Sequence, residues 1–100
     1  MLTYRTQLEQ QAKVAFARVE EERRREQERV DFLTMQIDEQ EAALASLAVD
    51  QVSEKWLIDN FIKGLRSDLQ LSRQRVINWN AACEAARQHL ILRAKEKKVL

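Results

Sequence analysis

Apolar residues recur three and four positions apart along most of the chain, and this spacing is interrupted in one place. Such spacing places side chains on one stripe of an α-helix. The 100 residues include no proline and a single glycine, Gly64, so few positions favour a helix break. The interruption lies at about residues 49–53, where Asp50 and Ser53 favour turns and helix starts. The sequence therefore predicts two long helices, at about residues 3–48 and 54–98.

Each predicted helix has one apolar stripe, and Ser53 is predicted to be the N-cap residue of the second helix. The first stripe comprises Phe16, Val19, Arg23, Glu26, Val30, Leu33, Ile37, Gln40, Leu44 and Leu47. It is predicted to continue toward the N-terminus, after a one-residue slip, through Tyr4, Leu8, Ala12 and Ala15. The second stripe comprises Ile58, Ile62, Leu65, Leu69, Ser72, Val76, Trp79, Cys83, Ala86, Leu90, Arg93, Lys97 and Leu100.

A turn centred on Gln51 would bring the two stripes into antiparallel register. Leu33 then faces Leu69, and Phe16 faces Ala86. Large residues face small ones in several layers, which keeps the seam at constant width. The predicted fold is all-α: a single domain, residues 1–100, in which two long helices form an antiparallel coiled-coil hairpin.

Composition and charge agree with a narrow seam. The apolar fraction is 45% and the charged fraction 33%, which is too polar for a thick core. Residues 1–50 carry 7 Lys/Arg and 11 Asp/Glu, a net of −4; residues 51–100 carry 10 and 5, a net of +5. Opposite charges favour helices lying side by side, although a chance distribution would look similar. The total of +1 gives no general attraction to nucleic acid or anionic lipid.

Arg23 and Glu26 interrupt the first stripe. We expect Arg23 to lie over Trp79 with its charge in water; a polar notch that fixes the register is the alternative. The run from Glu20 to Glu26 has nearly balanced charges, and its residues can form ion pairs at helical spacing. This run is interpreted as a solvated helix face, with pairs Glu20/Arg24, Glu21/Arg25 and Glu22/Arg25.

No residue pattern predicts catalysis. His89 is the single histidine and is expected on a solvated face. Cys83 is expected to be a small seam residue, and because it is the single cysteine, no disulfide can form within the chain. There is no phosphate loop, metal-ligand spacing, or apolar run of ~18 residues that would span a membrane. The N-terminus has no signal-peptide core. These features predict a cytoplasmic protein that is not an enzyme and holds no metal or cofactor.

The start of the second helix has more large apolar residues than one seam uses. Ile58, Ile62 and Leu65 are expected to point inward, which leaves Trp56, Leu57 and Phe61 partly outside. Exposed aromatic clusters favour partner binding; the alternative is that these residues cover the tip of the hairpin. Gly64 beside them lowers helix stability by about 1 kcal/mol relative to alanine and would permit a close approach.

Two stretches of the sequence follow a known pattern: Phe61-Ile62-Lys63-Gly64-Leu65, followed by Leu69 and Asn78-Trp79, and Leu2-Thr3-Tyr4-Arg5 with Glu9 and Ala12. In these residues the chain resembles the FliJ family of flagellar type III export chaperones. Family members usually extend further, so the resemblance implies a segment that stops within the second helix. It also implies a stalk like that of the rotary ATPase gamma subunit, acting in bacterial flagellum biogenesis and motility.

The implied role is to couple the export ATPase ring to the export gate, an FlhA-like membrane protein, and to escort substrate-specific export chaperones. The implied location is the inner-membrane export apparatus, reached through protein contacts only and without nucleic acid. The implied gate contacts are Phe61 and Leu65, which match the family pattern, and Asp68 and Ser72, which follow on the same stripe but depart from the family's residues. Trp56 and Leu57 join this candidate set because they are expected to be exposed beside it. The implied ring contacts lie at the end with both termini: Tyr4, Arg5, Arg93, Lys97 and Lys98.

Three other functions remain open on sequence grounds. One is the equivalent stalk of a virulence type III secretion system. Another is a generic coiled-coil module that dimerises. The third is a nucleic-acid or membrane-surface binder that uses the basic tail at residues 93–98.

Overall fold

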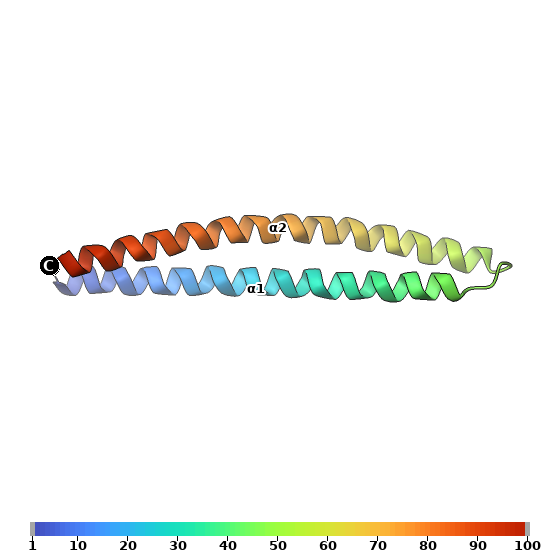
Figure 1. Cartoon of the computed structure of the whole chain (residues 1–100), viewed down its shortest axis with the longest axis horizontal. Coiled ribbons are helices and arrows are strands. Elements are labelled where there is room, and N and C mark those ends of the chain that lie inside the picture. Colours follow the sequence, from blue (N-terminus) through green and yellow to red (C-terminus); the bar gives the residue numbers. More distant parts are fainter. Residues whose placement is uncertain (1, 100) are drawn as a thin grey trace. The chain divides into compact units, whose positions relative to one another are not determined.

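The computed structural model describes residues 2–99 and shows an antiparallel pair of helices joined by a short link (Figure 1). Helix α1 spans Leu2–Ser46 and helix α2 spans Val52–Val99. No strand occurs within these residues. The predicted all-α fold, two long helices in an antiparallel hairpin, is therefore confirmed.

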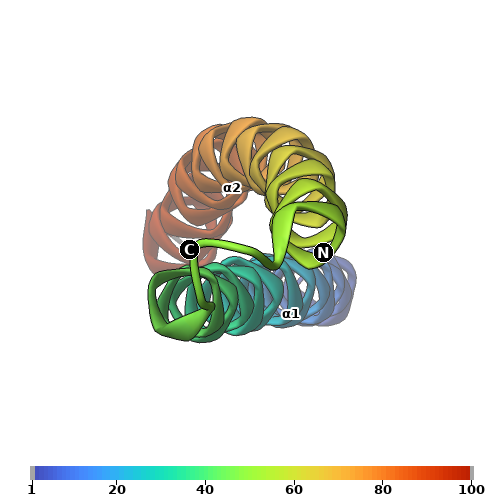
Figure 2. The ribbon, with the colours of Figure 1, turned by 90° about the vertical axis from the view of Figure 1, so that its right-hand side faces the viewer.

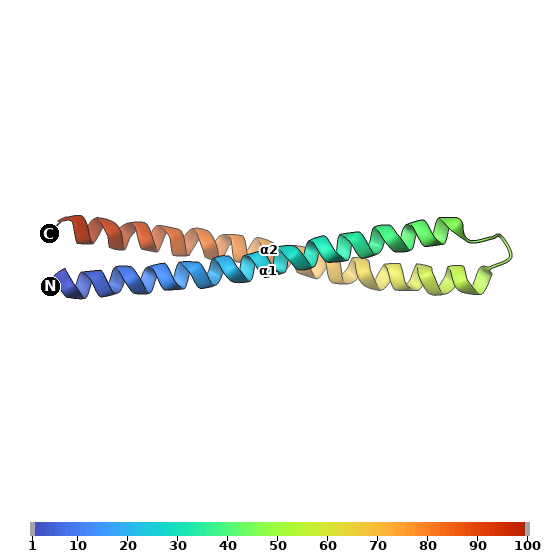
Figure 3. The ribbon, with the colours of Figure 1, turned by 90° about the horizontal axis from the view of Figure 1, so that it is seen from below.

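The chain divides into two compact units, and each contains a segment of both helices. Residues 2–25 and 76–99 form the terminal unit, and residues 26–75, which include the link, form the turn unit. Within each unit the α1 and α2 segments run side by side in opposite directions (Figure 3).

The link spans residues 47–51 and reverses the chain within the turn unit (Figure 2). The backbone N–H of Gln51 donates to the Ala48 carbonyl at 3.0 Å, which closes a tight turn. The Gln51 side-chain oxygen accepts from the Ala48 N–H at 2.7 Å. The Gln51 carbonyl also accepts the first helical hydrogen bond of α2, from Lys55 at 3.1 Å. No described residue has a positive φ, so this turn needs no glycine.

Two sequence predictions about the link are wrong. It begins two residues earlier than predicted, and Ser53 lies inside α2 and not at its N-cap. The residue that precedes the helix is Gln51, and its side chain and backbone together form the turn. The pattern of turn-forming residues does not predict this turn, because glutamine is not one of the residues that commonly form turns.

The core of the turn unit lies along the predicted seam. Leu33, Ile37, Ile62 and Leu69 form its buried cluster, and Val30, Leu44, Ile58 and Leu65 pack against this cluster. These residues alternate in steps of three and four on both helices, as expected for knobs-into-holes packing. The predicted seam positions of this unit are therefore confirmed.

The seam of the terminal unit differs from its prediction near the start of α1. Ala12 is buried and Leu8 is half-buried, as expected for seam residues. Tyr4 and Ala15 are both exposed, however, so the predicted one-residue slip of the stripe is wrong.

The stripe of α1 instead keeps its original spacing through Ala12, Glu9 and Arg5. The two charged residues occupy the seam because α2 supplies partners for them. Lys97 Nζ lies 3.4 Å from Glu9, and Arg5 donates to the Glu96 carbonyl at 2.6 Å.

On α2 the predicted stripe of this unit is confirmed as far as Lys97. Cys83 is buried, and Trp79, Ala86, Leu90, Arg93 and Lys97 are half-buried; Leu100 lies outside the described residues.

The charged run of α1 forms local ion pairs, as predicted for a solvated face. Arg25 pairs with Glu21 and Glu22, at 3.3 and 3.5 Å. Arg24 also pairs with Glu21, at 2.5 Å. The charges of this run are therefore largely balanced on the surface of α1 itself.

Arg23 and Glu26, the polar residues of the predicted α1 stripe, are both half-buried. Arg23 and Trp79 are both half-buried in the terminal unit. In the turn unit, Glu26 lies 3.7 Å from Arg75 Nη1, but the buried Oε1 of Glu26 accepts no hydrogen bond within residues 2–99. A carboxylate held this way weakens the seam locally.

Candidate docking surface on α2

Exposed apolar side chains follow one side of α2 in the turn unit. Leu57 is 61% exposed, Phe61 50% and Leu71 55%. Gly64 and Asp68 lie between them and are also exposed. The positions 57, 61, 64, 68 and 71 advance in steps of four and three, so they share one face of the helix. We call these five residues the α2 stripe.

The tip of the turn unit adds further apolar surface. Trp56 is exposed, and a hollow of about 440 Å³ lies among Val52, Ser53, Trp56 and Leu57. The predicted exposure of Trp56, Leu57 and Phe61 is therefore confirmed. Large exposed side chains of this kind desolvate much area when a partner binds.

Two residues of the implied gate set do not belong to this surface. Ser72 is fully buried, at 0% exposure, and cannot contact a partner, so its assignment as a docking residue is wrong. Leu65 is half-buried and packs against the core cluster, so its larger role is in the seam. Ser72 follows the buried Leu69 by three residues, and Leu65 follows the buried Ile62 by three. This spacing places both side chains on the inward face of α2.

Leu71 takes the place of Ser72 on the exposed face, and it was not among the predicted docking residues. Its position in the sequence would have predicted this exposure, because Leu71 follows the exposed Asp68 by three residues. This step continues the spacing that begins at Leu57, so Leu71 lies on the same face of the helix as Phe61.

Gly64 lies in the middle of the α2 stripe, and space is open around it. A methyl group there would meet no atom within 4 Å beyond its own helical surroundings. Gly64→Ala is therefore expected to raise the free energy of unfolding by about 0.5–1 kcal/mol, because alanine has the higher helix propensity. Urea denaturation followed by circular dichroism measures this change. A lower stability would show that the glycine is needed by the fold itself.

The residues implied as ring contacts fall into two groups. Tyr4 and Lys98 are exposed, whereas Arg5, Arg93 and Lys97 are half-buried. The half-buried residues already have partners within the terminal unit. Arg93 Nη1 lies 2.9 Å from Glu96, in addition to the contacts of Arg5 and Lys97 described above.

Glu9 lies among these basic residues of the terminal unit. Lys13 Nζ is 3.1 Å from its carboxylate, and Lys97 approaches from α2. Hydrogen bonding from Lys13 and the charge of Lys97 hold the pKa of Glu9 below its usual value. Lys97 therefore forms an ion pair in the seam and is not solely a surface charge.

The two units differ in net charge. The terminal unit carries 11 Lys/Arg and 6 Asp/Glu, a net of +5, while the turn unit carries 6 and 10, a net of −4. Each unit combines residues from both halves of the sequence, so counting charges by halves did not reveal this division. A basic terminal unit favours acidic partners, and an acidic turn unit disfavours nucleic acid.

Metal sites and membrane spans were sought among the described residues. No group of three or more His, Cys, Asp or Glu among residues 2–99 could hold a metal ion. None of the described helical segments combines the length and apolar character needed to cross a membrane.

The fold and this surface define an antiparallel helical hairpin with an exposed apolar stripe. No family model, curated protein or solved structure matches the chain.

Proposed function

We propose that this chain is a stalk and adaptor of flagellar type III protein export. In this role it couples an export ATPase ring to a gate membrane protein of the FlhA type and escorts substrate-specific chaperones. The observation that carries the proposal is the exposure of Leu57, Phe61 and Leu71 along one side of a hairpin helix. A partner that covers this side would remove three large apolar side chains from water.

The hairpin itself supports a coupling role. The α2 stripe lies in the turn unit, while the exposed Tyr4 and Lys98 lie in the terminal unit. The chain therefore offers one surface for a gate and a separate surface for a ring. The +5 charge of the terminal unit would attract an acidic ring surface. In the proposed location, the protein lies in the cytoplasm and reaches the inner membrane only through its partners.

The test is co-purification with the gate and ATPase proteins encoded in the same genome. Phe61→Ala combined with Leu71→Ala is expected to weaken gate binding at least about tenfold, because both side chains would lose their buried contact area. The same variant should keep the helix content of the wild type, since both residues are at least half exposed. Binding to the ATPase should not change, because the α2 stripe lies outside the terminal unit.

Phe32→Ala combined with Met35→Ala is the matched control. These residues are also exposed, on α1 in the turn unit. Gate binding that survives loss of Phe61 and Leu71, or that falls equally in the control, would remove the α2 stripe from the proposal. Binding to the ring and gate of a virulence secretion system, in place of the flagellar ones, would assign the chain to that system.

A further inference from the structure

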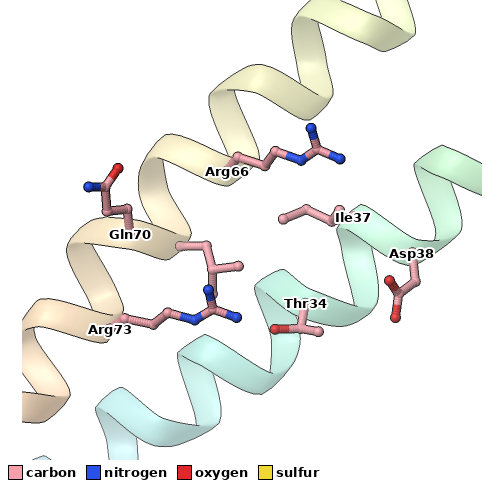
Figure 4. Close-up of a pocket in the computed structure, with 7 residues that line it drawn as sticks. Thr34, Ile37, Asp38, Arg66, Gln70 and Arg73 are labelled. Carbon is pink, nitrogen blue, oxygen red and sulfur yellow. The ribbon is translucent and has the colours of Figure 1, made fainter.

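A groove with two arginines lies between α1 and α2 in the turn unit, separate from the α2 stripe. It has a volume of about 450 Å³ (Figure 4). Thr34, Ile37 and Asp38 line it from α1, and Arg66, Leu69, Gln70 and Arg73 line it from α2. We call this hollow the arginine groove.

The floor of the groove is apolar. Ile37 and Leu69 both belong to the buried core cluster. The Thr34 hydroxyl donates to the Val30 carbonyl at 2.8 Å, so this hydroxyl is already satisfied on its own helix. An apolar side chain placed on this floor would extend the seam of the hairpin by another layer.

Two guanidinium groups flank this floor. Arg66 and Arg73 both extend from α2 toward α1, and Ile37 lies between their charged ends (Figure 4). The two residues are seven positions apart, about 10 Å along the helix axis. Arg66 pairs with Glu41. Arg73 forms no ion pair or hydrogen bond within residues 2–99, and within these residues no ion pair joins Asp38 to either arginine.

We propose that the arginine groove docks an acidic amphipathic helix of a partner protein. Guanidinium groups bind carboxylates with two parallel hydrogen bonds. Carboxylates seven residues apart on the partner helix would match the spacing of Arg66 and Arg73. Apolar residues between those carboxylates would lie over the floor at Ile37 and Leu69, which makes the partner a third helix on the hairpin; both floor residues are only 7% exposed, so the charged contacts supply the specificity. The turn unit as a whole carries a net charge of −4, so the attraction is local: the groove lining has two arginines against one aspartate, a net of +1.

The groove and the α2 stripe lie on opposite flanks of the seam. Phe61 and Asp68 each precede a buried residue of α2, whereas Arg66 and Arg73 each follow a seam residue. At about 100° per residue, these positions point to different sides of the helix. An occupant of the groove therefore leaves the α2 stripe open. The hairpin would hold two partners at once, which goes beyond the proposed function.

The probe for this proposal is a synthetic amphipathic peptide of about four helical turns. It carries leucines at helical spacing and two glutamates seven residues apart, and a second peptide has lysines in place of the glutamates. Fluorescence anisotropy at low ionic strength measures binding to the full chain. The glutamate peptide is expected to bind, and Arg73→Glu to weaken its binding about five- to tenfold, because repulsion replaces the ion pair.

Arg29→Glu is the matched control, because Arg29 is also exposed in the turn unit and also unpaired within residues 2–99. This control is expected to change the affinity less than about twofold, since its position on α1 is on the other flank of the seam. Equal binding of both peptides, or equal effects of the two substitutions, would overturn the proposal. Sedimentation that shows a wild-type dimer and an Arg73→Glu monomer would overturn it by assigning the groove to a second copy.

Discussion

Ile62→Ala is expected to lower the free energy of unfolding by about 2–3 kcal/mol. Ile62 is 3% exposed and lies in the core cluster with Leu33, Ile37 and Leu69. Replacing a buried isoleucine by alanine typically costs about 2–5 kcal/mol. The lower part of this range applies here, because a seam between two helices can close over the lost volume or admit water. Urea denaturation followed by circular dichroism measures the loss.

Phe61→Ala is the control for this prediction, because Phe61 is the adjacent residue and is half exposed. Its substitution is expected to cost less than about 1 kcal/mol, since much of the side chain is already in water. Ile62→Ala should therefore unfold at clearly lower urea concentration than Phe61→Ala. Equal losses would contradict the burial pattern of α2, because they would mean that the two positions are similarly buried.

The hairpin could be predicted from the sequence because its spacing constrains it strongly. Alternating steps of three and four define the seam, and the lack of proline leaves one plausible break. The pattern was misleading where the seam residues are charged. Near the start of α1, the apolar spacing predicts that the stripe slips by one residue and continues through Ala15, Ala12, Leu8 and Tyr4. The structure places Arg5 inward, where the Glu96 carbonyl accepts its hydrogen bond.

The candidate surface was predicted only in part. The exposure of Trp56, Leu57 and Phe61 followed from counting more apolar residues than one seam needs. Ser72 was assigned both to the seam and to the docking surface, and only the first assignment agrees with its complete burial. The arginine groove was not predicted: the register placed its two walls face to face, but the hollow between them depends on how the side chains pack.

The distribution of charge in the folded chain was also predicted only in part. The two halves of the sequence have opposite net charges, and this led to the expectation that the helices attract each other along the seam. The observed ion pairs between helices include Glu41 with Arg66 and Glu9 with Lys97. The division between a +5 terminal unit and a −4 turn unit depends on folding, because each unit takes residues from both halves. The net charge of each unit affects which partners it attracts and has little effect on which fold forms.

Ser72→Ala is expected to raise the free energy of unfolding by about 1–2 kcal/mol. Ser72 is completely buried, and its hydroxyl has no hydrogen-bond partner within residues 2–99. A buried hydroxyl without a partner costs about 1–3 kcal/mol, and alanine also has the higher helix propensity. The volume lost is a single oxygen atom, so the cavity that remains is small. The increase should appear as a higher urea midpoint with an unchanged slope.

Ser67→Ala separates the two contributions. Ser67 is exposed on the same helix, so water satisfies its hydroxyl, and only the gain in helix propensity, about 0.5 kcal/mol, is expected. The difference between the two variants therefore measures the cost of burying the Ser72 hydroxyl. If Ser72→Ala stabilises the hairpin no more than Ser67→Ala, the hydroxyl already has a partner in solution. In that case burial of the Ser72 hydroxyl does not weaken the seam.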